Sequence, residues 1–274
     1  MIEIQNLGEY LELDEKGHLI RKAELGQIQL RWRPLIDEVV EFYRSQFQEN
    51  LLSVYIRGSV AKGAAVDGIS DLDSFCITSR PVDPSPEAVE RFRKYVSERY
   101  AFTNGVELTG SSVDRLDQLH SPKKRNIWQE LVKTQSVCVW GEDLSEKIAP
   151  FELKDMVAHS YWIEREITAL PSKFQGDPTP KDSPEQVCTW IMKRIIRVGF
   201  EIVMLRENRW TRDLFPCFES FSRYYPEKKV LMQEALSLAL NPSRDPEVTI
   251  QLVDRFRPWL FEEIGKHVPY DEGK

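Results

Sequence analysis

The sequence has few cysteines, no long apolar run and no surplus of basic residues. Its 4 cysteines lie far apart, with no CxxC pair and no histidine at metal-ligand spacing, which argues against a structural zinc site or a disulfide framework. The most apolar stretch, residues 190–205, is interrupted by charged side chains. A membrane span needs roughly 20 consecutive apolar residues. We therefore expect no membrane-spanning segment.

The charge balance also excludes a class of protein. There are 37 Lys+Arg residues against 44 Asp+Glu, so the formal charge is 37 − 44 = −7. A protein that coats nucleic acid needs a broad basic surface, which this balance argues against. Residues 1–17 lack both a basic start and an apolar core, so no signal peptide is predicted and a cytoplasmic protein is expected. The sequence leaves a homodimer open.

Hydrophobic patterns up to residue 145 alternate between short β-type runs and helical periods. The chain has 274 residues, 41% of them hydrophobic and 30% charged, which is a globular composition long enough for one large domain or two. The expected strands are residues 53–56, 72–78, 106–109 and 137–140, and the expected helices are 34–46, 87–100 and 125–134. Such alternation predicts a mixed α/β domain.

The character of the sequence changes after residues 149–150. Long helical patterns follow, at residues 152–170, 187–206 and 227–240 and from residue 246 onward, and residues 171–184 form a proline-rich loop. We therefore predict an α+β fold with two domains. Residues 1–148 form an α/β domain with a mixed sheet, which begins with a small hairpin, and residues 149–274 form a helical bundle.

The most informative segment joins two of the predicted strands. Gly58-Ser59 directly follows the first strand, and Asp71 and Asp73 stand at the start of the second. Two carboxylates at i and i+2 of a strand project from the same face and repel each other unless a cation lies between them. Mg²⁺ takes oxygen ligands and usually keeps substrate phosphates in its coordination shell. The pattern therefore predicts a magnesium site.

The Gly-Ser turn suits the phosphates of a nucleotide. Gly58 lets the backbone approach a ligand closely, and free amides with the Ser59 hydroxyl can hold phosphate oxygens. Lys62 lies on the same turn, where a phosphate contact and a solvated lysine are equally consistent with the sequence. Gly-Ser alone is only a turn, and Asp-x-Asp is common on solvated strands. Their combination at this spacing favours a nucleoside triphosphate site.

This arrangement resembles the signature of the nucleotidyltransferase superfamily related to DNA polymerase β. In that superfamily a third carboxylate usually lies on a later strand, and Glu107 fits this place, with Asp114 and Asp117 as competitors. Residues 137–144 resemble the segment that closes this domain in aminoglycoside nucleotidyltransferases. The helical C-terminal domain of those enzymes also matches the predicted layout.

The resemblance implies a Mg²⁺-dependent transferase. Asp71, Asp73 and Glu107 would form its catalytic metal site, with two ions expected, and Glu107 would either complete the metal site or act as general base. ATP or another nucleoside triphosphate would be the co-substrate. The nucleoside monophosphate, AMP in the case of ATP, would pass to a hydroxyl of a small acceptor, and pyrophosphate would leave.

The long helix at residues 187–206 carries a charged stripe on a mostly apolar surface. Lys193, Arg197 and Glu201 follow each other at i, i+4 spacing. Buried charges need partners, and the partner here is either an acidic group of the protein or the triphosphate. Relatives place basic residues of the helical domain near the nucleotide, which implies nucleotide binding by Arg197 and Arg212. A lysine is usual near the latter position, so this sequence departs from the family there.

Two other functions remain open at this stage. One is AMP transfer to a protein, as in nucleotidyltransferases of toxin–antitoxin pairs, although those chains are much shorter. The other is a nucleotide-binding regulator without chemistry. An acidic cleft suits a cationic acceptor such as an aminosugar. A nucleic acid acceptor is disfavoured, because no basic stripe with interleaved aromatic residues is present.

Overall fold

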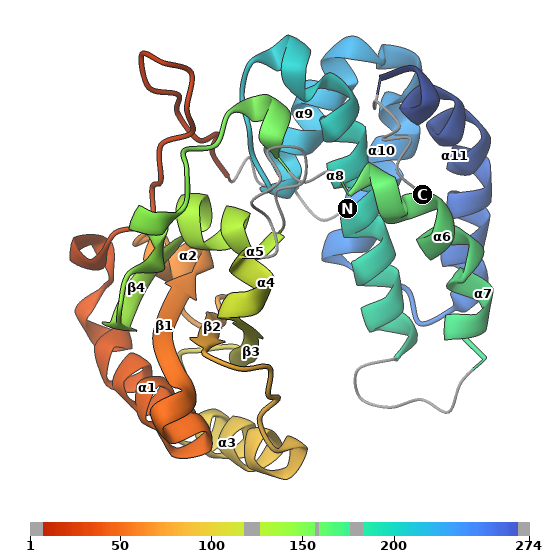
Figure 1. Cartoon of the computed structure of the whole chain (residues 1–274). Coiled ribbons are helices and arrows are strands. Elements are labelled where there is room, and N and C mark those ends of the chain that lie inside the picture. The colour runs from red at the N-terminus through yellow and green to blue at the C-terminus, as the bar shows by residue number, and fades with distance from the viewer. Residues whose placement is uncertain (1–7, 118–126, 157–158, 176–182, 268–274) are drawn as a thin grey trace. The chain divides into compact units, whose positions relative to one another are not determined.

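The computed structural model describes residues 8–117, 127–156, 159–175 and 183–267 (Figure 1). The chain divides into two compact units. Residues 13–156 form an α/β unit, and residues 8–12 join residues 159–267 in a helical unit. The sequence instead predicts residues 8–12 as part of the N-terminal domain. They join the helical unit because the Leu11 N–H donates to the Trp210 carbonyl (2.8 Å) and the Tyr10 hydroxyl lies 2.7 Å from the Ser220 hydroxyl.

The α/β unit contains a four-stranded mixed sheet. Its strands are β1 (Leu51–Arg57), β2 (Leu72–Thr78), β3 (Val106–Ser112) and β4 (Ser136–Gly141). The spatial order is β3-β2-β1-β4, with β2 and β3 parallel and the other pairs antiparallel. The predicted α+β class with a mixed sheet is confirmed, and each predicted strand is present, three of them extended at their ends.

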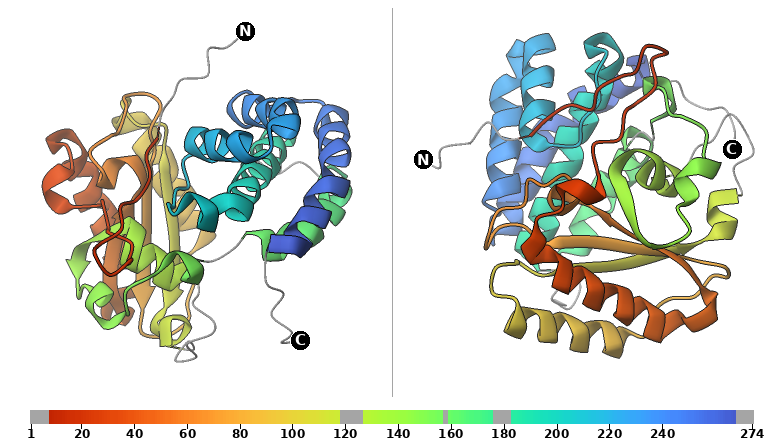
Figure 2. Two further views of the ribbon diagram at one scale, coloured as in Figure 1. Left: turned by 90° about the horizontal axis from the view of Figure 1, so that it is seen from above. Right: turned by 90° about the vertical axis from the view of Figure 1, so that its left-hand side faces the viewer.

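Each face of the sheet buries alternate residues of the strands, as the period of two requires. Helices α1 (Arg33–Phe47) and α3 (Pro86–Arg99) lie along one face, against Val54 and Ile56 (Figure 2). Tyr55, Phe75 and Ile77 face the other way, into a second apolar cluster. Three short helices belong to this unit: α2 (Gly58–Ala61), α4 (Val113–Asp117) and α5 (Ile127–Glu130). The predicted helix at 125–134 is present as α5 and a π-helical turn over Leu131–Gln135, and its first two residues lie outside the described part.

Helix α8 (Pro184–Glu207) lies at the centre of the helical unit. It contacts helices on several sides because its apolar residues cover most of its circumference, and Ile191, Ile195 and Val198 are almost fully buried. The other helices are α6 (Ser160–Thr168), α7 (Leu170–Lys173), α9 (Leu214–Tyr224), α10 (Lys229–Leu240) and α11 (Pro246–His267). In the ranges that the structure describes, no helix has the length and apolar character of a membrane span.

The prediction of one helix over residues 152–170 is wrong. The structure has a single 3₁₀ turn at Leu153–Asp155, and α6 begins only at Ser160. Helix α9 was not predicted at all. Residues 171–184 are predicted as a loop. This is wrong for residues 171–173, which belong to α7, and half of the stretch, residues 176–182, lies outside the described residues. Of the predicted hairpin, the structure has a single bridge between Leu13 and Leu19. The segment before this bridge pairs with the helical unit instead, through a bridge between Leu11 and Trp210.

Candidate active site

Three charged side chains share the sheet face opposite α1 and α3. Arg57 ends β1, and Asp73 and Glu107 lie at directly paired positions near the starts of the parallel strands β2 and β3. Because alternate strand residues share a face, Arg57 and Asp73 lie on the same side as Tyr55 and Phe75. The Arg57 Nη2 atom lies 3.1 Å from Asp73 Oδ1 and 2.5 Å from Glu107 Oε2. The structure thus brings together two of the predicted carboxylates and one guanidinium.

The turn after β1 is built against the Asp73 carboxylate. Gly58 has φ +72°, a left-handed conformation that side chains with a Cβ rarely adopt. A Cβ atom at this position would overlap the Asp73 Oδ2 atom. The absence of a side chain at Gly58 therefore lets the carboxylate lie directly on the turn. The Gly58 turn and Asp73, which belong to the two halves of the sequence motif, therefore lie in contact.

A serine pair closes the loop between α2 and β2. The Ser59 hydroxyl donates to the Ser70 hydroxyl at 3.0 Å, and the Ser70 hydroxyl also accepts from the Val66 N–H at 2.9 Å. These bonds hold the start of α2 beside the end of the loop. Lys62 directly follows α2 and begins this loop. Asp71 is the last residue of the loop, directly before β2, and it is exposed.

A buried network behind the carboxylates fixes β3 against β2. The Tyr43 hydroxyl, from α1, donates to the Thr109 carbonyl at 3.0 Å and accepts from the Thr109 N–H at 3.1 Å. The Ser74 hydroxyl donates to the Glu107 carbonyl at 2.6 Å. Burial raises the pKa of Tyr43, so the phenol stays protonated and able to donate. The spacing of Tyr43 among the apolar residues of its helix predicts only a core position and does not reveal its polar partners.

The oxygen donors at this end of the sheet fit a magnesium ion that is also bound by a nucleotide. In the described ranges, no group of three or more His, Cys, Asp and Glu side chains is arranged to hold a metal ion. Mg²⁺ is usually held by one or two carboxylates together with substrate phosphates and water, so it does not require three protein ligands. Asp73 supplies hard oxygen donors against the Gly58 turn, and Asp71 lies two residues before it in the sequence. The residues present therefore fit Mg²⁺ when a nucleotide supplies further ligands.

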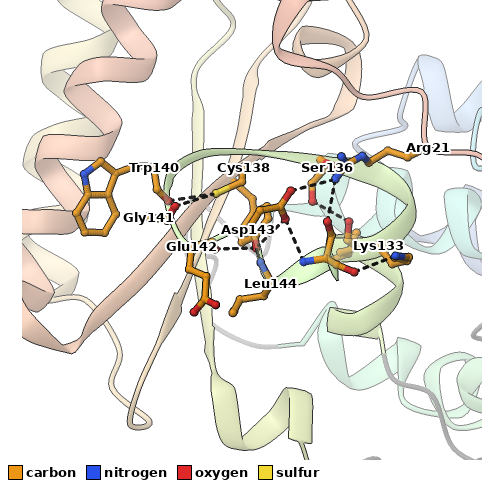
Figure 3. A network of polar contacts seen from close by, with 12 residues as sticks. Arg21, Lys133, Ser136, Cys138, Trp140, Gly141, Glu142, Asp143 and Leu144 are labelled. Atoms are coloured by element: carbon orange, nitrogen blue, oxygen red, sulfur yellow. Dashed lines mark hydrogen bonds and ion pairs between the residues drawn. The ribbon is translucent and has the colours of Figure 1, made fainter. Parts of the chain in front are cut away.

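The segment after β4 has a structural role (Figure 3). The Asp143 carboxylate accepts from the Ser145 N–H at 3.0 Å and from the Tyr55 hydroxyl at 3.4 Å, and it lies 3.7 Å from the Arg21 guanidinium. Asp143 therefore caps the next turn and ties it to β1. A groove of about 640 Å³ runs beside it, lined by residues 21, 23–26, 137–141 and 143. This groove follows β4, at the opposite edge of the sheet from β3, and contains none of the predicted site residues.

The helical unit holds its own polar cluster around α8. The Arg197 Nε atom donates to the Arg212 carbonyl at 3.2 Å, and the Arg212 guanidinium lies 3.4 Å from His159 Nε2. Glu201, from the predicted charged stripe, accepts from the backbone N–H groups of His159 (2.6 Å) and Ser160 (2.9 Å) and caps the start of α6. The structure thus brings Arg197 and Arg212 together. Sequence reasoning assigned no role to His159, although the stripe already signalled buried polar partners.

His159 gives this unit a predicted pH dependence. Burial, and then the guanidiniums of Arg212, Arg194 and Arg197, lower the pKa of His159 to about 2, outweighing the Glu201 carboxylate 3.7 Å away. The unfolded histidine titrates near pH 6.5, so below that pH unfolding takes up a proton and stability falls by roughly 1.4 kcal/mol per pH unit. From pH 6.5 to pH 5 we expect a loss of about 2 kcal/mol from this group.

His159→Gln should remove this contribution and flatten the decline, which urea unfolding at pH 7.5 and pH 5 measures. His18→Gln in the α/β unit is the matched control and should keep the steep loss. Equal slopes for wild type and His159→Gln would contradict the assignment.

This chain is similar to known proteins in structure, and no similarity is found in sequence. No protein family and no curated protein matches the sequence. Solved structures do match. There are 10 such chains, among them the crystal structure of spectinomycin adenyltransferase AAD(9) from Enterococcus faecialis with ATP and spectinomycin. That chain is 12% identical, with a TM-score of 0.45 over 85% of this chain and 99% of its own. A similarity of this degree does not establish a family, so we take the function from the residues of this chain.

Proposed function

We propose that this protein is a Mg²⁺-dependent nucleotidyltransferase. It transfers a nucleoside monophosphate, AMP from ATP in the first instance, to a hydroxyl of a small molecule and releases pyrophosphate. The observation that carries the proposal is the position of Asp73. Its carboxylate rests on the Gly58 turn and stands opposite Glu107 in the paired register of β2 and β3. The turn that would bind the phosphates thus lies against one member of the carboxylate pair.

The carboxylates account for the metal requirement. Asp71 and Asp73 would hold Mg²⁺, and Glu107 would either add a further ligand or accept the proton of the acceptor hydroxyl. The ion supplies charge neutralisation for the phosphates as pyrophosphate leaves. Glu107 reaches the same place from the neighbouring strand, with 37% of its side chain exposed, so it is open to an acceptor as well.

The remaining residues bind the nucleotide. The Ser59 hydroxyl and the amides of the Gly58 turn would hold the β- and γ-phosphates, and Lys62 on the same loop would add positive charge. Arg197 and Arg212 of the helical unit are proposed as further phosphate ligands. While these residues hold the β- and γ-phosphates, the acceptor hydroxyl attacks the α-phosphorus. A new phosphorus–oxygen ester bond forms, the bond to the β-phosphate oxygen breaks, and the hydroxyl proton passes to a base.

The acceptor class follows from charge. Asp71, Asp73 and Glu107 place three carboxylates at this end of the sheet, and Arg57 compensates part of their charge. A hydroxylated amine gains attraction from such a site, whereas an anionic acceptor is repelled. We therefore propose a small cationic acceptor of the aminosugar or aminocyclitol type.

Thermal shift and product analysis test the proposal together. ATP should raise the melting temperature only when Mg²⁺ is present, because binding to the folded state alone stabilises it. Addition of a panel of hydroxylated amines, spectinomycin among them, should then release pyrophosphate and yield an acceptor heavier by one nucleoside monophosphate. Binding of Mg²⁺ and ATP without any transfer would instead identify a nucleotide-binding regulator. Labelling of a protein with AMP would identify a protein acceptor.

A further inference from the structure

Arg57 contacts both carboxylates of the site from a third strand. It ends β1, and its Nη2 atom alone reaches Asp73 Oδ1 at 3.1 Å and Glu107 Oε2 at 2.5 Å. Since β2 lies between β1 and β3, the side chain crosses over β2 to meet Glu107. A guanidinium nitrogen therefore lies where the two carboxylates converge.

The electrostatics of this arrangement need a cation. Two carboxylates held at paired positions repel each other, and Asp71 adds a third negative charge nearby. The Asp73 side chain is 19% exposed and that of Arg57 26%, so solvent screens the group only in part. The guanidinium supplies positive charge to both carboxylates, and so it stabilises Asp73 and Glu107 side by side.

We propose that Arg57 is a built-in counter-ion that makes Mg²⁺ binding depend on the nucleotide. This inference rests on the proposed function. Free Mg²⁺ must compete with Arg57 for Asp73, and the protein then provides it with only one or two carboxylate ligands. Mg²⁺ that arrives with a triphosphate brings phosphate oxygens as additional ligands, and the exchange then becomes favourable. Arg57 releases Asp73 at this step and remains available to Glu107.

A structural ion pair makes a different prediction. Such a pair holds β1 to β2 and β3, and its loss lowers stability without changing the affinity for a metal ion. A counter-ion that occupies the metal site opposes Mg²⁺, so its removal must raise the affinity for Mg²⁺ in the absence of nucleotide. Metal affinity of the free protein therefore separates the two roles.

Calorimetric titration of the full chain with Mg²⁺ alone is the test. Arg57→Gln should bind Mg²⁺ at least about tenfold more tightly than wild type, which corresponds to about 1.4 kcal/mol. The double variant Arg57→Gln, Asp73→Asn should lose this gain. Arg31→Gln is the matched control, because Arg31 forms an exposed ion pair with Asp67 in the same unit, outside the carboxylate pair. It should bind Mg²⁺ like wild type.

A second variant keeps the test decisive if Arg57→Gln does not fold. In Arg57→Lys the charge remains, but a compact ammonium replaces the planar fork, so a smaller gain of about threefold is expected. Unchanged Mg²⁺ affinity in the folded variants would overturn the inference, even with nucleotidyl transfer intact. A gain in Mg²⁺ affinity without any transfer activity in wild type would uphold the inference and reject the proposed function.

Discussion

Asp73→Asn is expected to lower nucleotidyl transfer by at least about 1,000-fold, because the amide cannot replace a carboxylate that holds Mg²⁺ against the triphosphate. The side chain is nearly isosteric, and Arg57 keeps its contact with Glu107, so the fold should persist. Pyrophosphate release with ATP and a competent acceptor measures the effect. The melting temperature of the variant without ligands checks that it is folded.

Asp67→Asn is the matched control for this change. Asp67 lies in the loop before β2, is exposed, and pairs with Arg31 outside the carboxylate pair. Its conversion to an amide should leave at least half of the turnover. If Asp73→Asn kept more than a tenth of the wild-type rate, the metal site would have to lie elsewhere.

Gly58→Ala should remove most of the transfer activity. It should lower the free energy of unfolding by little more than an alanine does at another position with the same backbone conformation. A left-handed residue with a Cβ costs roughly 1–2 kcal/mol. The added methyl group at Gly58 would also overlap Asp73 Oδ2. That oxygen is the end of a short side chain and can rotate away, so the consequence falls on the site and not on the core. We expect turnover to fall by about 100-fold or more, as expected for a displaced reacting group.

Gly68→Ala isolates the contribution of the contact with Asp73. Gly68 has φ +71°, almost the value of Gly58, but nothing lies within 4 Å of the position that its Cβ would take. Urea unfolding should show similar losses for the two variants, whereas only Gly58→Ala should lose pyrophosphate release. Full activity in Gly58→Ala would show that the close packing of turn and carboxylate is not needed for catalysis.

Local sequence patterns were sufficient to predict the strands and most of the helices. The β-branched and aromatic run before Gly58 predicts β1, because its period and composition depend only on neighbouring residues. The predicted helix over residues 152–170 failed for the opposite reason. Its break is set by Glu201, which caps Ser160 from more than 40 positions away in the sequence. Sequence periodicity does not register a cap supplied by another helix.

The sequence by itself determined the α+β class, the Gly-Ser turn and the Asp-x-Asp pair, because turns, periods and motif spacing are properties of short segments. Only the tertiary structure decided that Glu107 stands opposite Asp73, that Arg57 joins the two, and that Tyr43 fixes the strands behind them. These contacts depend on strand order and register. Register is set by the packing of the whole sheet against its helices, and so it is not encoded in any one segment.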